Sequence, residues 1–214
     1  YYGSGKATLG SEGDFVTSPS MSNDFAFLLS KQIEEWLIQV NGKLIFDNKL
    51  SVLEFGSGDG SLMSGILEYF FINNKKIFKK VCFIIVEPNK GMVKKQKKKL
   101  EKYLQLGFDI LWRTLEELED SSLNGVILAN EVLDALPVER IINLKGKLYR
   151  QGVSIDKESG SLRSKEIAIT NKLKKSIASA QEKLDINIPP KDAPEGWTPE
   201  WHIENKSWLK AVYK

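Results

Sequence analysis

Apolar and polar residues along the chain follow two periods, one typical of helices and one typical of buried strands. Between Ser22 and Val40 the apolar residues recur every three or four positions, which predicts an amphipathic helix that ends at Asn41-Gly42. Beyond it, short apolar runs alternate with helical stretches. We expect strands at 51–55, 81–86, 108–112 and 125–129, and helices at 61–71, 89–104 and 115–118. This alternation predicts an α/β fold with a doubly wound, mostly parallel sheet and helices on both faces.

The pattern changes beyond Pro137, where two apolar-rich segments flank a short turn. Residues 138–144 and 148–155 predict a hairpin, and a helix is expected at 171–184, a proline-rich loop at 188–196 and a helical segment at 201–213. We therefore expect three regions. They are an N-terminal loop and helix at 1–44, an α/β core at 45–137, and a hairpin and helical region at 138–214 on the substrate side.

The composition excludes several kinds of chemistry but does not identify the reaction. With 42% hydrophobic and 28% charged positions, the 214 residues fit one globular domain with a small appendage. No apolar run approaches a membrane span and no signal peptide is visible, so we expect a cytoplasmic protein. One histidine, His202, and one cysteine, Cys82, exclude the usual His/Cys zinc site and argue against a Ser-His-Asp triad. Cys82 lies in an apolar run, which predicts an inert core residue.

A glycine-rich turn follows the first predicted strand in the segment Glu54-Phe55-Gly56-Ser57-Gly58-Asp59-Gly60. Glycines allow backbone angles that other residues resist, and they let a ligand approach the chain closely. In an open α/β sheet this turn lies at the carboxyl edge, where ligands bind. A tight strand-to-helix turn without a ligand is the alternative interpretation.

An acidic residue, Glu87, ends the second predicted strand. A carboxylate at that position can accept hydrogen bonds from both hydroxyls of a ribose, although it could instead be a surface carboxylate at the start of a helix. The dinucleotide fingerprint is not met, because the third glycine, Gly60, comes one residue early and Ser61 stands in its place. Glu87 also falls later than the usual ~20 positions after the glycines. Both departures favour a methyl donor over a nicotinamide.

The pattern E-x-G-x-G-x-G, with an acidic residue after the second strand, resembles that of class I S-adenosylmethionine-dependent methyltransferases. The resemblance implies a Rossmann-like fold and S-adenosylmethionine as the cofactor. It places Glu54 near the methionine amino group, Glu87 at the ribose, and Gly56, Gly58 and Gly60 along the cofactor. A class I sheet has seven strands, whereas we find four and a hairpin, so we expect a fragment that is incomplete at the C-terminus.

Two further segments resemble the MidA family, whose mitochondrial member is a protein-arginine methyltransferase for assembly of respiratory complex I. They are Gly13-Asp14-Phe15-Val16-Thr17-Ser18-Pro19 and Asn130-Glu131-Val132-Leu133-Asp134-Ala135-Leu136-Pro137-Val138. The resemblance implies a protein substrate, with a respiratory complex I-type subunit as the candidate partner, and a loop with Asp14, Thr17 and Ser18 folded over the cofactor. These three could instead be turn and cap residues. The family usually has glutamate at Ser20, and Phe-Gly-Glu where this chain has Phe25-Ala26-Phe27.

The segment that begins at Asn130 follows the fourth predicted strand, so Asn130, Glu131 and Asp134 are expected to project beside the sulfonium of the cofactor. Methyl transfer is an in-line displacement, and the enzyme mainly has to align and desolvate the nucleophile. Carboxylates would orient a guanidinium and stabilise its charge. Asn130 and Asp134 could alternatively cap the following turn.

Three functions are compatible with the sequence. A protein-arginine methyltransferase uses both the glycine loop and the acidic segment, whereas an assembly factor that binds the cofactor without turnover, or a nicotinamide-binding oxidoreductase, uses them only in part. The lysine run at 94–99 could bind an acidic partner, but without interleaved aromatics it is typical of a solvated helix face. We therefore expect no nucleic-acid partner and no membrane span.

Overall fold

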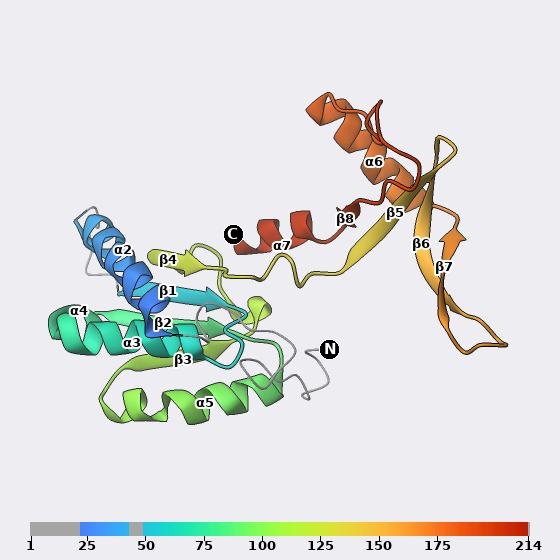
Figure 1. Cartoon of the computed structure of the whole chain (residues 1–214). Helices are drawn as coiled ribbons and strands as arrows, with labels where there is room; N and C mark the ends of the chain where they lie inside the picture. The colour runs from blue at the N-terminus through green and yellow to red at the C-terminus, as the bar shows by residue number, and fades with distance from the viewer. Residues whose placement is uncertain (1–21, 43–48, 214) are drawn as a thin grey trace. The chain divides into compact units, whose positions relative to one another are not determined.

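The computed structural model describes residues 22–42 and 49–213 (Figure 1). They form two compact units, one that ends at Val132 and one from Leu133 to Tyr213. Asp14, Thr17 and Ser18 lie outside the described residues, so their expected place over the cofactor stays a prediction. Across the described ranges, none of the helices combines the length and the apolar character that crossing a membrane would need.

The first unit is a four-stranded parallel sheet with helices in the connections, as the sequence predicts. Its strands are β1 (Leu50–Phe55), β2 (Val81–Val86), β3 (Asp109–Arg113) and β4 (Gly125–Leu128). Its helices are α2 (Asn23–Asn41), α3 (Ser61–Asn73), α4 (Lys75–Phe78), α5 (Lys90–Gln105) and the 3-10 turn η2 (Leu115–Glu117). The order β3-β2-β1-β4 reverses direction at β1, and such a switch point is where α/β sheets bind ligands.

The core of this unit lies between one face of the sheet and the helices α2, α3 and α5 (Figure 1). Strand residues of that face, such as Val52 and Phe83, are fully buried against helix residues such as Ile66 and Leu100. A Cβ added to Gly65 of α3 would lie 2.4 Å from the Cβ of Ala26, so α2 and α3 approach closely there. Under this packed face β1 and β2 pair in parallel with Phe55 opposite Val86, and that register positions the site described below.

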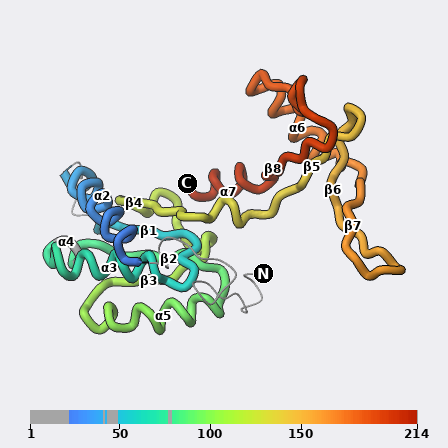
Figure 2. The backbone as a smooth tube through the Cα atoms, in the orientation of Figure 1, coloured from blue at the N-terminus to red at the C-terminus, as the bar shows by residue number. Residues whose placement is uncertain are grey.

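The second unit is antiparallel. Its strands are β5 (Val138–Leu144), β6 (Lys147–Ile155), β7 (Leu162–Ile167) and β8 (Glu200–His202), in the order β7-β6-β5-β8 (Figure 2). The expected hairpin is present as β5 and β6. Helix α6 (Asn171–Leu184) covers the sheet by packing Leu173 and Ile177 against Ile141, and α7 (Asn205–Val212) follows β8.

One expectation for this unit is wrong. Trp201, placed in a helical segment at 201–213, lies in β8, where it pairs with Glu139 of β5. Its indole N–H donates a hydrogen bond of 3.0 Å to the hydroxyl of Ser176 in α6. The physical reason is that pairing with a distant strand outweighs local helical spacing in so short a segment.

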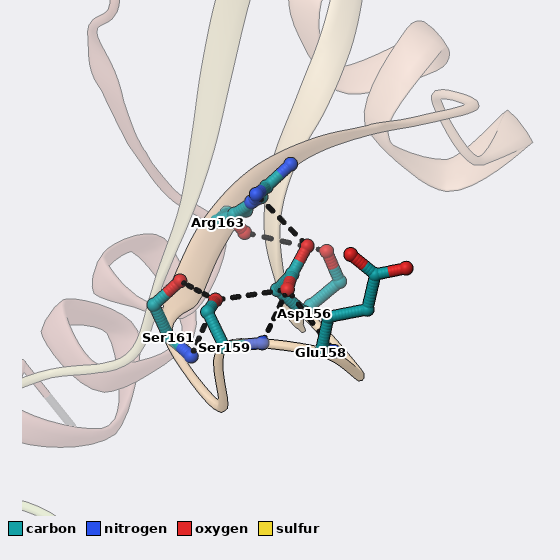
Figure 3. Close-up of polar contacts among 6 residues, drawn as sticks. Asp156, Glu158, Ser159, Ser161 and Arg163 are labelled. Carbon is teal, nitrogen blue, oxygen red and sulfur yellow. Dashed lines mark hydrogen bonds and ion pairs between the residues drawn. The ribbon is translucent and has the colours of Figure 1, made fainter.

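A polar cluster at the turn between β6 and β7 is explained by the turn itself (Figure 3). The carboxylate of Asp156 accepts hydrogen bonds of 2.8 Å from both the backbone N–H and the hydroxyl of Ser159, and it forms an ion pair of 2.9 Å with Arg163. Gly160 supplies the left-handed backbone that the turn needs, at φ 68°. These contacts close the hairpin and leave no polar group of the cluster to be explained by a ligand.

Candidate functional site

The loop after β1 adopts a conformation that requires glycine at three positions. Gly56, Gly58 and Gly60 have φ values of 61°, 54° and 86°, all in the left-handed region. The N–H of Gly56 donates to the carbonyl of Val86 at 3.1 Å, and the N–H of Gly60 donates to the carbonyl of Ser57 at 2.8 Å. The loop therefore leaves β1 in a tight turn and presents bare backbone at the carboxyl edge of the sheet.

Glu54 lies at the base of this loop with a side chain that is only 3% exposed. Its carboxylate accepts a hydrogen bond of 2.6 Å from the hydroxyl of Ser57. Burial raises the pKa of Glu54 to about 7, although the Ser57 hydroxyl opposes the shift. A buried carboxylate with one hydrogen bond from a neutral partner can gain a cationic ligand, such as an ammonium group.

Glu87 is brought to the same edge by the strand register. Phe55 of β1 pairs with Val86 of β2, so Gly56 and Glu87 are the next residues beyond the two strands. The carboxylate of Glu87 accepts a hydrogen bond of 2.9 Å from the backbone N–H of Asn89. Burial raises the pKa of this carboxylate, and the hydrogen bonds from Asn89 and Gln96 partly offset that shift. The glycine loop and the acidic strand end are thus neighbours.

Gln96 of α5 joins these parts and was not found from the sequence. Its amide N–H group donates 2.8 Å to the carbonyl of Gly58 and 3.2 Å to the carboxylate of Glu87. Its amide oxygen accepts 3.1 Å from the indole N–H of Trp112. The sequence did contain a sign that Gln96 is buried, because it stands four residues from both Met92 and Leu100 on the same face of α5.

A second link ties the loop to α5 through Asp59. Its carboxylate accepts a hydrogen bond of 3.0 Å from the N–H of Ser61 and forms an ion pair with Lys99, which also donates to the Ser61 hydroxyl at 2.7 Å. Burial alone would raise the pKa of Asp59, but the hydrogen bonds from Lys99 and Ser61 hold it below its usual value. The remaining lysines of the run at 94–99 are exposed, as expected of a solvated face.

The turn after β4 lies next to the glycine loop. A Cβ added to Gly56 would lie 3.2 Å from the Cγ2 atom of Val132, so Val132 is packed against the loop. Glu131 is exposed and has a φ of 50°, a conformation that is uncommon for a residue other than glycine. Asn130 and Glu131 thus immediately precede the residue that contacts the loop, and their expected place beside the sulfonium stays a prediction. Asp134 belongs to the second unit, and its place beside them stays a prediction.

Cys82 takes no part in this site. It is buried in β2, and burial together with neighbouring Asp109 raises the pKa of its thiol to about 11. A thiol with so high a pKa is a poor nucleophile at neutral pH, which agrees with the expectation of an inert core cysteine.

Comparisons with known proteins agree with this arrangement. A family model described as "Putative S-adenosyl-L-methionine-dependent methyltransferase" matches residues 28–214. The mitochondrial protein arginine methyltransferase NDUFAF7 of Xenopus tropicalis is 28% identical over 159 residues, 64% of this chain, and its mitochondrial homolog in Caenorhabditis elegans is 25% identical over 159 residues, 65% of this chain. A Burkholderia thailandensis protein solved with bound S-adenosyl-homocysteine has a TM-score of 0.70 and 25% identity over 95% of this chain.

The chain corresponds to only part of these proteins. The matched region covers 35% of each curated relative and 48% of the solved Burkholderia chain. The family match includes residues of both compact units, so the antiparallel unit belongs to the same shared architecture as the parallel sheet. The relatives support a methyl donor as the cofactor and give no support to a nicotinamide-binding oxidoreductase.

Proposed function

Because the chain belongs to the family of S-adenosyl-L-methionine-dependent methyltransferases, we propose that it forms the cofactor-binding part of an enzyme that methylates arginine in a protein substrate. The observation that carries the proposal is the meeting of three features at one sheet edge. They are the left-handed glycine loop, the carboxylate of Glu87, and the turn with Glu131 that packs on Gly56 through Val132.

The cofactor would be held by groups whose chemistry fits its parts. The Glu54 carboxylate is buried and suits the ammonium of the methionine moiety, and the Glu87 carboxylate suits the ribose hydroxyls. The left-handed backbone of Gly56, Gly58 and Gly60 forms a tight turn, and its main chain is what the cofactor would approach. When bound, S-adenosylmethionine supplies a methyl group on a sulfonium, which is a good leaving group.

Glu131 is the residue we assign to the nucleophile. Its carboxylate can accept two parallel hydrogen bonds from a guanidinium and fix the plane of that group. Its left-handed backbone supports a functional role, because strained conformations of this kind cluster at active sites. Asn130 and Asp134 complete the proposed set, with Asn130 as a further hydrogen-bonding group and Asp134 as a second carboxylate.

The substrate class rests on the relatives. Both curated relatives are named protein arginine methyltransferases, which supports a protein substrate here. The resemblance of residues 13–19 and 130–138 to the MidA family is the basis on which we propose a respiratory complex I-type subunit as the partner. The sequence favours a cytoplasmic location, whereas both relatives are mitochondrial by name. Fractionation of the source cells, with an antibody against this protein, distinguishes the two compartments.

The test is transfer of labelled methyl groups from S-adenosylmethionine to proteins of the source organism, followed by mass analysis of methylated arginines. We expect labelled arginine with the wild-type protein and at least about tenfold less with Glu131→Gln, because one charge-assisted hydrogen bond is weakened. Binding of S-adenosyl-homocysteine without any transfer would instead identify an assembly factor that uses the cofactor without turnover.

A further inference from the structure

Gln96 is the polar residue on the buried face of a lysine-rich helix. That face of α5 consists of Met92, Gln96, Leu100 and Tyr103, and the side chain of Gln96 is completely buried. A buried amide is costly unless its donors and its acceptor find partners. The partners of Gln96 therefore show what the amide stabilises, and two of the three, Gly58 and Glu87, lie at the candidate cofactor site.

The three hydrogen bonds of Gln96 reach the carboxyl ends of three neighbouring strands. Gly58 lies beyond β1, Glu87 follows β2, and Trp112 lies near the end of β3. One side chain thus fixes the glycine loop, the acidic strand end and the edge strand relative to each other. The backbone of the loop passes close by, because a Cβ added to Gly60 would lie 3.5 Å from the Cγ atom of Gln96.

We propose that Gln96 is a positioning residue, which holds the glycine loop and the Glu87 carboxylate at the spacing that a nucleoside requires before the cofactor binds. The inference rests on the proposed role of Glu87 at the ribose. One oxygen of Glu87 accepts from Asn89 and the other from Gln96, and each carboxylate oxygen has a second lone pair that remains for a ribose hydroxyl. A site ordered in advance avoids the entropy cost of ordering on binding.

The amide is the side chain that fits all three partners. A glutamate would bring a second negative charge beside Glu87, and a lysine would compete with the ribose for the same carboxylate. A methionine has almost the same length but leaves the carbonyl of Gly58 and one oxygen of Glu87 without their donor. Only a group that donates twice and accepts once satisfies Gly58, Glu87 and Trp112 together.

The experiment measures affinity for S-adenosyl-homocysteine by calorimetry in the wild-type protein, Gln96→Met and Gln105→Met. Gln105 is an exposed residue of the same helix and serves as the matched control. We expect Gln96→Met to lose about tenfold or more in affinity, since two hydrogen bonds that orient the site are removed. Gln105→Met should stay within about twofold of the wild type.

A second readout separates positioning from simple core packing. The affinity of methylthioadenosine is compared with that of its 2′-deoxy analogue, and the ratio gives the contribution of one ribose hydroxyl. We expect a ratio of about ten in the wild type and about three or less in Gln96→Met, because Glu87 is no longer held toward that hydroxyl. The inference would be overturned if Gln96→Met had the same affinity ratio as the wild type. Any loss of affinity in that variant would then follow from its lower thermal stability alone.

Gln96→Asn covers the case in which Gln96→Met does not fold. This variant keeps the amide but shortens the side chain by one methylene. We expect a similar loss of affinity for S-adenosyl-homocysteine and a similar fall in the ratio of the two methylthioadenosine affinities. Wild-type values of both quantities would overturn the proposal. Glu87→Ala identifies a failure of the premise. If that variant binds S-adenosyl-homocysteine as well as the wild type does, the proposed ribose role of Glu87 is wrong, and the inference falls with it.

Discussion

Single carboxylates at the sheet edge carry the most direct consequences, and Glu54 is the first. Its pKa of about 7 means that it changes charge near neutral pH. If the ionised carboxylate binds the ammonium of the cofactor, affinity for S-adenosyl-homocysteine should be roughly tenfold lower at pH 6 than at pH 8. Calorimetry across this range measures the effect. Glu54→Gln should bind more weakly and without this dependence, and the same slope in the variant would contradict the assignment.

The same group predicts the direction of a stability change. The pKa of Glu54 in the folded protein, about 7, lies above its ordinary value of 4.5, so the folded state keeps its proton longer than the unfolded chain. Folding stability should therefore fall as the pH rises from 4.5 to about 7 and level off above it. Glu54→Gln should melt at a higher temperature than the wild type at pH 8, while binding the cofactor less well.

Glu131 allows a test in which stability and activity move apart. Glu131→Gly relieves the left-handed backbone at φ 50°. The melting temperature should therefore stay equal or rise, and the free energy of unfolding should increase by at most on the order of 1 kcal/mol. Methyl transfer should nevertheless be lost. Glu131→Gln should keep cofactor affinity and reduce transfer about tenfold. Wild-type turnover per folded molecule in both variants would remove Glu131 from the site.

A site residue can be predicted from the sequence when local structure determines its position, and it is missed when distant contacts do. Glu54, Gly56 and Glu87 follow from strand ends and from a loop that needs glycine, and both features are local. Gln96 acts through contacts with Gly58 and Trp112, which are brought to it by the fold. Its position on the buried face of α5 gave a signal, but the surrounding lysines are typical of a solvated helix.

Two loops meet at the sheet edge through Gly56 and Val132, and we expect them to act as one element. Gly56→Ala would place a methyl group 3.2 Å from Val132 and would force an alanine into a backbone with φ 61°. We expect weaker binding of S-adenosyl-homocysteine and a lower melting temperature. The free energy of unfolding should fall by roughly 1–2 kcal/mol. Adding Val132→Ala should restore part of the loss, because the side-chain contact is relieved while the backbone strain remains. Strict additivity in the double variant would show that the loops are independent.

Elements with a strong local pattern match their expected bounds, whereas elements made by distant pairing do not. The strands β2 and β5 and the helix α6 have the ranges expected from the sequence. Strand β7 was not expected, because it is exposed along its length and has a largely polar sequence. Strand β8 has three residues and exists through pairing with Val138–Arg140, which local spacing cannot reveal.

At the scale of the whole molecule, the sequence predicted the parallel α/β sheet and the separate hairpin region. It could not predict that the hairpin grows into a four-stranded antiparallel sheet covered by α6, because two of the four strands lack a sequence signature. The family match spans both units, so the antiparallel unit is part of what the relatives share. The expected place of the region at 138–214 on the substrate side stays a prediction.

The measurement that tests the central claim most directly is a calorimetric titration of the wild-type protein and Glu87→Ala with S-adenosyl-homocysteine and with NAD. We predict one cofactor per chain for the wild type, no NAD binding, and about thirtyfold or greater loss of S-adenosyl-homocysteine affinity in Glu87→Ala, since two charge-assisted hydrogen bonds are removed. Glu101→Ala, an exposed carboxylate on α5, should behave like the wild type. Equal affinity in wild type and Glu87→Ala, or tighter binding of NAD, would contradict the account.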